Sequence, residues 1–458
     1  MTMDARLGRT AAALLALAVT ATLTACGSAA AGPRTAAAGP HAAATGPGLP
    51  ASPPPGTAPL GAVPPAPLAP GTPALPLWRG SWAASPQQPL DVAWSGRGFA
   101  DRTLRQTVRL TAGGDRVRVE LTNRYGTTPL RVTRATVARA APSGDGSVAP
   151  GSVRPLRFDG RPSVTIPPGD TLLSDTADLP VEALAPLAVT LYLAEPTGPA
   201  TFHRIAATSL LATGDHSADP SGSAFREAGG SWYYLSGVEV SGGREAVRRG
   251  GVVAFGDSIT DGAGATRDAN ARYPDELAER LAAAGRPRAV LNHGISGNQV
   301  VNDTTWAGEK ALTRFRKDVL TERGVRTVIL LEGINDLGSS EVNPPSTATP
   351  EVTVDRLIAA HLTLVAEARA HGLRVIGATL TPVGGSPYDT PTVEAKRNAF
   401  NHWVRTSGAY DAVVDFDRAL ADPSAPHRLL PAYDSGDHLH PGDAGYHAMA
   451  EAVDLDAL

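Results

Sequence analysis

The sequence contains a single cysteine, Cys26, among 458 residues. One cysteine excludes a disulfide within the chain, so the folded parts must be stabilised by packing. The eleven histidines are scattered, without the His-x-x-x-His or cysteine spacing that is typical of zinc ligands. Neither sign of charge is in large excess, because the formal net charge is -4. Without a basic stripe, binding to a phosphate backbone is not expected. The composition therefore predicts no metal, no other cofactor and no nucleic-acid partner.

Several common catalytic motifs are incomplete. The segment Gly294–Asn298 lacks the last glycine of Gly-x-Ser-x-Gly, which argues against the nucleophile elbow of an α/β-hydrolase. The segment Gly262–Arg267 lacks the third glycine of a dinucleotide-binding loop, and no Walker sequence is present. These absences argue against an α/β-hydrolase elbow, a dinucleotide-binding loop and a Walker-type phosphate-binding loop.

Long apolar runs are missing as well. The apolar stretch from Ala11 to Leu23 is too short to span a bilayer comfortably, and it follows the basic residues Arg6 and Arg9. With the small residues before Cys26, this start resembles a bacterial lipoprotein signal over residues 1–25. The resemblance implies cleavage before Cys26, lipidation of its thiol and anchoring to a membrane. An ordinary secretory signal is the alternative, and both predict an extracytoplasmic protein.

Residues 26–77 are mostly alanine, proline and glycine. Few large apolar side chains are present to offset the entropy of ordering, so we expect a disordered linker. The composition changes near residues 77 and 245, which predicts two folded parts, residues 78–245 and 246–458.

Apolar residues alternate with polar ones in residues 78–245. Val117, Val119 and Leu121 alternate with charged or polar neighbours, and residues 187–193 repeat this pattern. A period of two is typical of strands with one buried face. We therefore predict an all-β sandwich of jelly-roll type. Six aromatic residues of this part can either fill its core or stack on sugars, and the core is favoured: Trp78, Trp82, Trp94, Trp232, Tyr233 and Tyr234.

Strand and helix patterns alternate in residues 246–458, which predicts an α/β domain with a flavodoxin-like parallel sheet. The expected strands are 251–255, 289–292, 327–331, 374–378 and 412–416. The clearest expected helices are 273–284, 353–370, 392–404 and 444–453, the second with an apolar face of Leu357, Ile358, Leu362 and Val365. Polar groups that follow these strands should meet beyond the carboxyl edge of the sheet.

Ser258 directly follows the first expected strand, in Gly256-Asp257-Ser258. A serine there can be a nucleophile if a base takes its proton, or merely a helix cap. Asp437 and His440 lie three residues apart in a turn-rich segment, so the carboxylate can hold one imidazole nitrogen while the other faces the serine. His438 is the rival base, but adjacent side chains in a turn diverge.

Two further residues are suited to stabilise a negatively charged oxygen. Gly297 exposes a backbone N–H without a side chain in the way, although it is equally suited to a positive φ. Asn335, in Gly333-Ile334-Asn335-Asp336, offers a carboxamide N–H, or alternatively forms an Asx-turn.

Together these segments resemble, in order and spacing, the blocks of the SGNH, or GDSL-type, hydrolases. The resemblance covers about residues 250–458 and implies a serine esterase or lipase. It makes Ser258, Asp437 and His440 the catalytic residues, with an oxyanion hole formed by the Ser258 amide, Gly297 and Asn335. The segment Trp82–Pro86 and the strands around it resemble accessory domains that precede some esterases of this group.

The implied function is hydrolysis of carboxylic esters, with short acyl groups favoured. An O-acetyl esterase acting on carbohydrate or peptidoglycan is the alternative, and a non-catalytic glycan-binding lipoprotein is a third possibility. The partners are then a small or glycan-linked ester and, through Cys26, a membrane. Residues 338–350 and 384–391 are expected to line the mouth of the site.

Overall fold

The computed structural model describes residues 77–242, 250–342 and 351–458. Residues Pro73–Leu458 form one compact unit. The predicted signal, Cys26 and residues 26–76 of the predicted linker lie outside the described residues, as do residues 243–249 and 343–350. The predicted boundaries of the folded parts therefore stay predictions. Among the described residues, no helix is both long and apolar enough to cross a membrane.

The first described part, up to residue 242, is built from antiparallel β-sheets, as predicted. One sheet has the order β1-β15-β3-β8, with β9 also paired to β3, and a six-stranded sheet has the order β13-β12-β2-β10-β5-β6. Short pairs join β4 to β7 and β11 to β14. The strands are β1 Trp78–Ala83, β2 Arg102–Arg109, β3 Gly114–Thr122, β4 Leu130–Val132, β5 Arg134–Arg139, β6 Arg154–Pro155, β7 Val164–Ile166, β8 Thr171–Leu173, β9 Ala177–Val181, β10 Pro186–Leu193, β11 Phe202–His203, β12 Ser209–Thr213, β13 Glu227–Gly229, β14 Trp232–Tyr233 and β15 Leu235–Ser241.

Alternation along the strands explains why the two main sheets share a core. Val117, Val119 and Leu121 of β3 are fully buried, and they belong to the same apolar cluster as Leu104 of β2 and Leu191 of β10. This is the expected result of period-two sequences that bury one face each. Five of the six aromatic residues are buried in that cluster, which confirms the interpretation as core: Trp82, Trp94, Trp232, Tyr233 and Tyr234.

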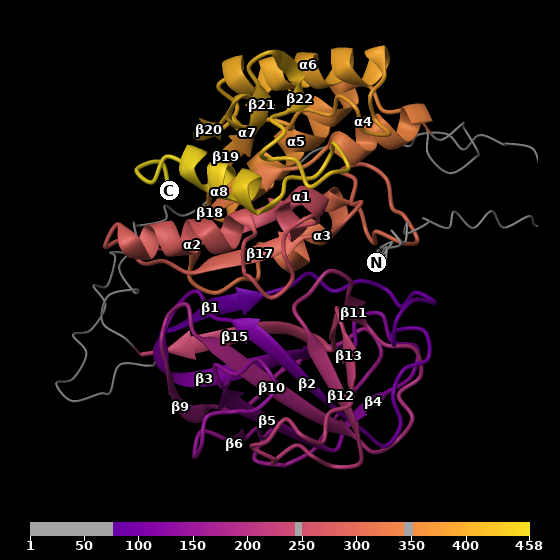
Figure 1. Cartoon of the computed structure of the whole chain (residues 1–458), viewed down its shortest axis with the longest axis vertical. Coiled ribbons are helices and arrows are strands. Elements are labelled where there is room, and N and C mark those ends of the chain that lie inside the picture. The colour runs from indigo at the N-terminus through magenta and orange to yellow at the C-terminus, as the bar shows by residue number, and fades with distance from the viewer. Residues whose placement is uncertain (1–76, 243–249, 343–350) are drawn as a thin grey trace, which may run out of the picture. The chain divides into compact units, whose positions relative to one another are not determined.

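The second described part is an α/β domain with a five-stranded parallel sheet, which confirms the predicted fold class (Figure 1). The sheet order is β17-β16-β18-β19-β20. In chain order this is 2-1-3-4-5, the flavodoxin-like arrangement. Its strands are β16 Gly251–Gly256, β17 Val290–Gly294, β18 Val325–Leu331, β19 Arg374–Ala378 and β20 Ala412–Val414, and a separate pair is formed by β21 Ala421–Asp422 and β22 Ala425–Leu429.

Eight helices are assigned in the described residues of this domain. Helix α8 packs against α2 and α7, whereas α6 packs against α4 and α5, and α5 also packs against α3. Two separate groups of helices are expected for a sheet covered on both faces. The helices are α1 Ser258–Asp261, α2 Tyr273–Ala283, α3 Ala311–Asp318, α4 Ile334–Val342, α5 Val354–Ala370, α6 Pro391–Thr406, α7 Phe416–Leu420 and α8 Asp443–Ala452.

Two details differ from the sequence-based expectation. The last parallel strand ends at Val414 rather than at 416, because the Asp415 side chain accepts from the N–H of Arg418 and caps α7. On α5, Leu362 is 45% exposed, whereas His361 is buried. The buried face runs through Leu357, His361 and Leu364, so a polar residue occupies a core position that the apolar pattern assigned elsewhere.

The sheet register determines where the site is. Gly256 at the end of β16 pairs with Gly294 of β17 on one side and with Leu331 of β18 on the other. The three loops that follow therefore leave the sheet at one level. In a 2-1-3-4-5 sheet the chain order reverses between the first and third strands, and ligands bind there. Ser258 and Asn335 follow the two strands that flank this point.

The β-rich part is bonded directly to the α/β domain. The N–H of Gly80 in β1 donates to the carbonyl of Arg323 (3.0 Å), and the Thr111 hydroxyl accepts from the N–H of Val290 in β17 (3.0 Å). Ala83 belongs to the apolar cluster of the α/β domain, and Ala289 to that of the β-sheets. The two cores therefore meet without an intervening solvent layer at these residues.

Candidate active site

Ser258 lies at a tight turn between β16 and α1. Asp257 caps this short helix, because its carboxylate accepts from the N–H of Ile259 (3.0 Å). A Cβ on Gly256 would lie 2.1 Å from the Thr260 hydroxyl and 2.5 Å from the carbonyl of Leu331. Only glycine allows this approach, so the glycine of the Gly-Asp-Ser motif lets the helix begin directly above the strand.

The structure brings Ser258, His440 and Asp437 together in one hydrogen-bonded chain. His440 Nε2 lies 2.8 Å from Ser258 Oγ, and His440 Nδ1 lies 2.6 Å from Asp437 Oδ2. A carboxylate only accepts, so Nδ1 carries the ring proton and Nε2 is the acceptor of the serine hydroxyl in the neutral ring. This is the geometry of an activated serine nucleophile.

The Asp437 carboxylate is held in its charged form. Partial burial favours the neutral acid, but hydrogen bonds from the His440 ring and from the N–H groups of His440 and Leu439 outweigh it, so the pKa of Asp437 lies well below its usual range. The Asp437 side chain is 52% exposed and that of His440 18%. The carboxylate is thus charged, and it is open to solvent on one side.

His438, the rival base, is placed elsewhere. Its Nδ1 lies 2.6 Å from Asp434 Oδ2, and its side chain is half exposed. Its φ of 65° is the left-handed conformation, which turns the side chain away from that of the neighbouring residue. Because of this bend, His440 lies within hydrogen-bond distance of Ser258, whereas His438 bonds to Asp434.

The predicted oxyanion donors lie just beyond the ends of β16, β17 and β18: Ser258 begins α1, Gly297 lies in a loop and Asn335 is at the start of α4. Gly297 has φ 80°, which confirms that this position needs the backbone freedom of a glycine. Within the described residues, the backbone N–H groups of Ser258 and Gly297 donate to no protein acceptor. Asn335 is buried; its Nδ2 donates to the carbonyl of Asn298 (3.0 Å), and its Oδ1 accepts from the Tyr388 hydroxyl (3.1 Å). One amide hydrogen of Asn335 remains available to a ligand.

Tyr388 lies in the loop 384–391 that was expected to line the mouth, and it orients Asn335 as just described. Most of the other expected loop, residues 343–350, lies outside the described residues. Gly338, the first residue of that expected loop, packs against the ring of Tyr388. A Cβ at Gly338 would lie 2.4 Å from ring atoms. The prediction that these segments line the mouth of the site is therefore supported only for residues 384–391.

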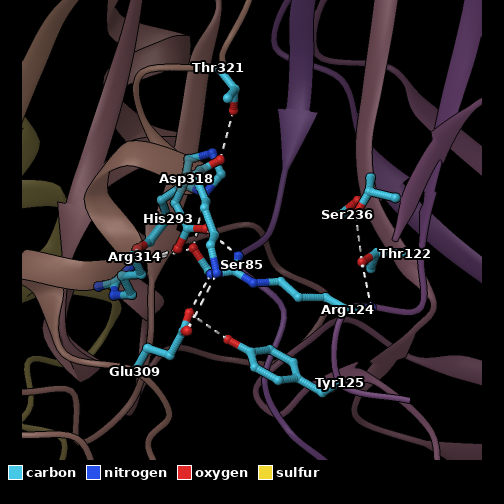
Figure 2. A network of polar contacts seen from close by, with 12 residues as sticks. Ser85, Thr122, Arg124, Tyr125, Ser236, His293, Glu309, Arg314, Asp318 and Thr321 are labelled. Carbon is cyan, nitrogen blue, oxygen red and sulfur yellow. Dashed lines mark hydrogen bonds and ion pairs between the residues drawn. The ribbon is translucent and has the colours of Figure 1, made fainter. Parts of the chain in front are cut away.

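The sequence analysis missed Arg314 on α3, which Figure 2 shows beside Ser85, His293 and Asp318. Its guanidinium is buried and donates to the carbonyl of Gly256 (2.8 Å), to Asn298 Oδ1 (2.7 Å) and to Glu332 Oε1 (3.0 Å). These acceptors precede or follow Ser258, Gly297 and Asn335 in the chain. One side chain therefore positions all three loops.

Buried carboxyl groups surround this arginine. Burial, with the nearby Asp257 charge, raises the pKa of Glu332 well above its usual range, and burial raises that of Asp257 to about 6. Asp318 behaves oppositely: burial is outweighed by Arg124 and Arg314, so its pKa is lowered. Arg314 and Asp318 thus form the ionised pair of this layer, while Glu332 favours its neutral form.

No group of three or more His, Cys, Asp or Glu side chains is arranged to hold a metal ion in residues 77–242, 250–342 and 351–458.

Residues 254–448 match the family model described as the GDSL-like lipase/acylhydrolase family. This part of the chain is a GDSL-like lipase/acylhydrolase domain. The protein is accordingly an ester hydrolase, and the resemblance that the sequence motifs indicated is confirmed. The matched residues begin within β16 and include every predicted catalytic and oxyanion residue.

Solved structures with a similar domain include a GDSL-like lipase from Bacteroides thetaiotaomicron, which is 19% identical over 45% of this chain and 86% of its own, with a TM-score of 0.34. An acetyl xylan esterase from Geobacillus stearothermophilus is 24% identical over 44% of this chain and 92% of its own, with a TM-score of 0.36. An alpha/beta hydrolase from the metagenome of Lake Arreo, Spain, is 25% identical over 44% and 92%, with a TM-score of 0.35. No curated relative was found.

We predict that Gly297→Ala lowers kcat on a small ester on the order of 10²-fold, similar to the loss of one oxyanion donor. A Cβ at Gly297 would lie 1.8 Å from the Trp306 ring, so loop and indole must separate. Gly308→Ala is the matched control, because Gly308 has the same φ of 80° and no atom within 4 Å of its Cβ. Equal losses in the two variants would refute the steric explanation, whereas Gly297→Ala/Trp306→Ala should recover part of kcat.

Proposed function

We propose that this protein is a serine esterase that works through Ser258, His440 and Asp437. The observation that carries the proposal is the continuous chain from Ser258 Oγ to His440 (2.8 Å) and on to Asp437 (2.6 Å), beside two N–H groups without a protein acceptor. A hydroxyl, a base with a fixed tautomer and unoccupied donors are the parts that acyl transfer requires.

The reaction then follows in two halves. His440 Nε2 takes the hydroxyl proton as Ser258 Oγ attacks the ester carbonyl, and the oxygen that becomes negative accepts from the N–H groups of Ser258, Gly297 and Asn335. His440 returns the proton to the departing alcohol, which leaves an acyl-serine. Water gives its proton to His440, attacks the acyl carbon and releases the acid as Ser258 regains its proton. Asp437 stabilises the imidazolium that forms in each half.

The acyl group is proposed to be short. The groups proposed to surround the reacting carbonyl are small or polar, namely Gly297, Asn335 and His440, and Asn335 accepts a hydrogen bond from Tyr388. Such a lining suits an acetyl or similarly small group better than a long alkyl chain. A series of p-nitrophenyl esters of rising chain length measures this preference, and a kcat/KM that rises toward long chains would contradict it.

Replacement of the proposed residues should separate their roles. Ser258→Ala and His440→Ala should each lower kcat on p-nitrophenyl acetate by about 10⁴-fold or more, because either loss disables the nucleophile. Asn335→Ala should cost about 10²- to 10³-fold. His438→Ala is the matched control, since it removes the adjacent histidine with its own aspartate partner, and it should retain activity. Full activity in Ser258→Ala would refute the mechanism.

A second candidate function is the removal of O-acyl groups from carbohydrate, and Trp306 favours it. Its side chain is 46% exposed, and its ring packs against Gly297 beside the proposed oxyanion donor. An exposed indole next to a reacting ester can stack on a sugar ring, and aromatic contacts contribute about 0.5–1.5 kcal/mol beyond area burial. The Asp437 side chain is half exposed, so the triad reaches the solvent at this end.

We expect Trp306→Ala to lower kcat/KM on acetylated xylo-oligosaccharide about tenfold and to change that on p-nitrophenyl acetate less than twofold, by loss of a stacking contact of about 1.5 kcal/mol. Trp306→Phe should lie between wild type and Trp306→Ala on the sugar ester. Equal effects of Trp306→Ala on both substrates would show that the indole supports the loop rather than the sugar.

We further propose that the enzyme acts outside the cytoplasm, held to a membrane through an acylated Cys26. The support is the sequence alone: a basic start, a short apolar stretch and a cysteine after small residues. Cys26→Ser should abolish incorporation of labelled fatty acid and release the protein into the medium, whereas Ser28→Ala should change neither. Retention of the label in Cys26→Ser would refute acylation at this residue.

A further inference from the structure

The nucleophile helix and the loop that carries Gly297 are joined by one buried carboxylate. Asp261 is the last residue of α1, three residues after Ser258, and is 1% exposed. Its Oδ2 accepts from both the N–H (2.9 Å) and the hydroxyl (2.6 Å) of Ser296, the residue before Gly297. The distance between the serine nucleophile and the Gly297 N–H therefore depends on the position of the Asp261 carboxylate.

The other oxygen of this carboxylate is bonded by the β-rich part. His203 of β11 places Nε2 3.0 Å from Asp261 Oδ1, across 58 residues of sequence. The imidazole is 3% exposed and stacks on Trp232, with ring centroids 5.6 Å apart and planes inclined by 28°. A buried ring that stacks on an indole and is bonded at both nitrogens has little freedom, so it holds Asp261 in one position.

Both ring nitrogens of His203 take part in hydrogen bonds. Its Nδ1 lies 2.8 Å from the carbonyl of Ser85, which can only accept, so Nδ1 carries a proton. The 3.0 Å contact between Nε2 and Asp261 Oδ1 needs a second proton between them. Removal of the imidazole would leave a buried carboxylate oxygen without its donor, and such a group is costly unless the structure rearranges.

Ser85 links this contact to the layer beneath the site. Its hydroxyl lies 2.9 Å from His293 Nδ1 and accepts from Arg314 Nη1 (3.4 Å), as Figure 2 shows for these three residues. The same short segment of the β-rich part thus contacts His203 through its carbonyl and Arg314 through its hydroxyl. Both routes end at loops of the candidate active site.

We propose that His203 is a positioning residue of the esterase: through Asp261 and Ser296 it fixes the Gly297 N–H relative to Ser258 Oγ. The β-rich part is then a component of the active site and not a separate module. This inference rests on the proposed function, since it assigns His203 a role in stabilising the oxyanion. It touches neither substrate nor reacting atoms and acts through Asp261 alone.

The experiment uses the full chain with His203→Gln, His203→Ala and Asp261→Asn. His216→Gln is the matched control, because His216 also lies in the β-rich part and pairs with an aspartate, Asp219, at 2.7 Å, but it is partly exposed and its pair lies within that part. For each variant kcat and KM on p-nitrophenyl acetate are measured well below the melting temperature, together with the rate at which Ser258 reacts with a p-nitrophenyl alkylphosphonate. That reagent forms a tetrahedral adduct whose oxygen occupies the oxyanion position.

We expect kcat to fall about 10- to 100-fold in His203→Ala, less in His203→Gln, which keeps an amide donor, and not in His216→Gln. KM should stay within about twofold, and the phosphonate rate should fall in parallel with kcat. The double variant His203→Ala/Asp261→Asn should lose little more than the worse single variant, because both residues act in one chain. If His203→Ala does not fold, the kcat values of His203→Gln and Asp261→Asn test the proposal.

Unchanged kcat in the folded His203 variants, or an equal loss in His216→Gln, would overturn the proposal. A lower melting temperature without a change in kcat would do the same, since it would assign His203 to stability only. Ser258→Ala, measured alongside, distinguishes this failure from failure of the proposed function. If Ser258→Ala is inactive and His203→Ala fully active, only the positioning role is wrong; if Ser258→Ala is active, the esterase mechanism is wrong.

Discussion

The buried guanidinium of Arg314 is the interaction on which the site depends most. Its Nη2 donates to the strand end before Ser258 and to the carboxyl before Asn335, and its Nε donates to the residue after Gly297. It also lies over the ring of Phe255, 3.9 Å from the centroid. A buried cation is tolerated only when it is paired and hydrogen bonded, so these loops must stay close to it. Because the guanidinium needs these partners, it keeps the segments that carry the reacting groups together at one edge of the sheet.

The β-rich part completes this layer from the other side. Arg124 donates to Asp318 Oδ1 (2.8 Å) and to Glu309 Oε2 (2.5 Å), and Tyr125 donates to the same Glu309 oxygen, as Figure 2 shows. Asp318 in turn accepts from Arg314. Since buried polar groups need their partners, separating the two parts would leave several of them unpaired. The polar network, together with the shared apolar contact at Ala83, makes the parts interdependent.

Much of the fold follows from local patterns. Residues 117–121 alternate apolar and polar side chains, and β3 buries every second one. The parallel strands are nearly continuous apolar runs, as expected for a sheet covered on both faces. Helix α3 was not among the expected helices, and its buried face is not purely apolar, because it carries Arg314 and Asp318 besides Ala311 and Phe315. Likewise, Leu362 points outward while His361 is buried and bonded to the Tyr410 hydroxyl at 2.8 Å.

The sequence by itself determined which chemical groups could meet, because the end of each parallel strand puts its next residues at one edge and the turn 437–440 brings a carboxylate to an imidazole locally. Only the tertiary structure brings His440 to Ser258, over a separation of 182 residues. It also decided that Arg314 and His203 support the site. Such contacts join distant segments through burial and hydrogen-bond demand, and these depend on how whole elements pack, a property that no short stretch of residues encodes.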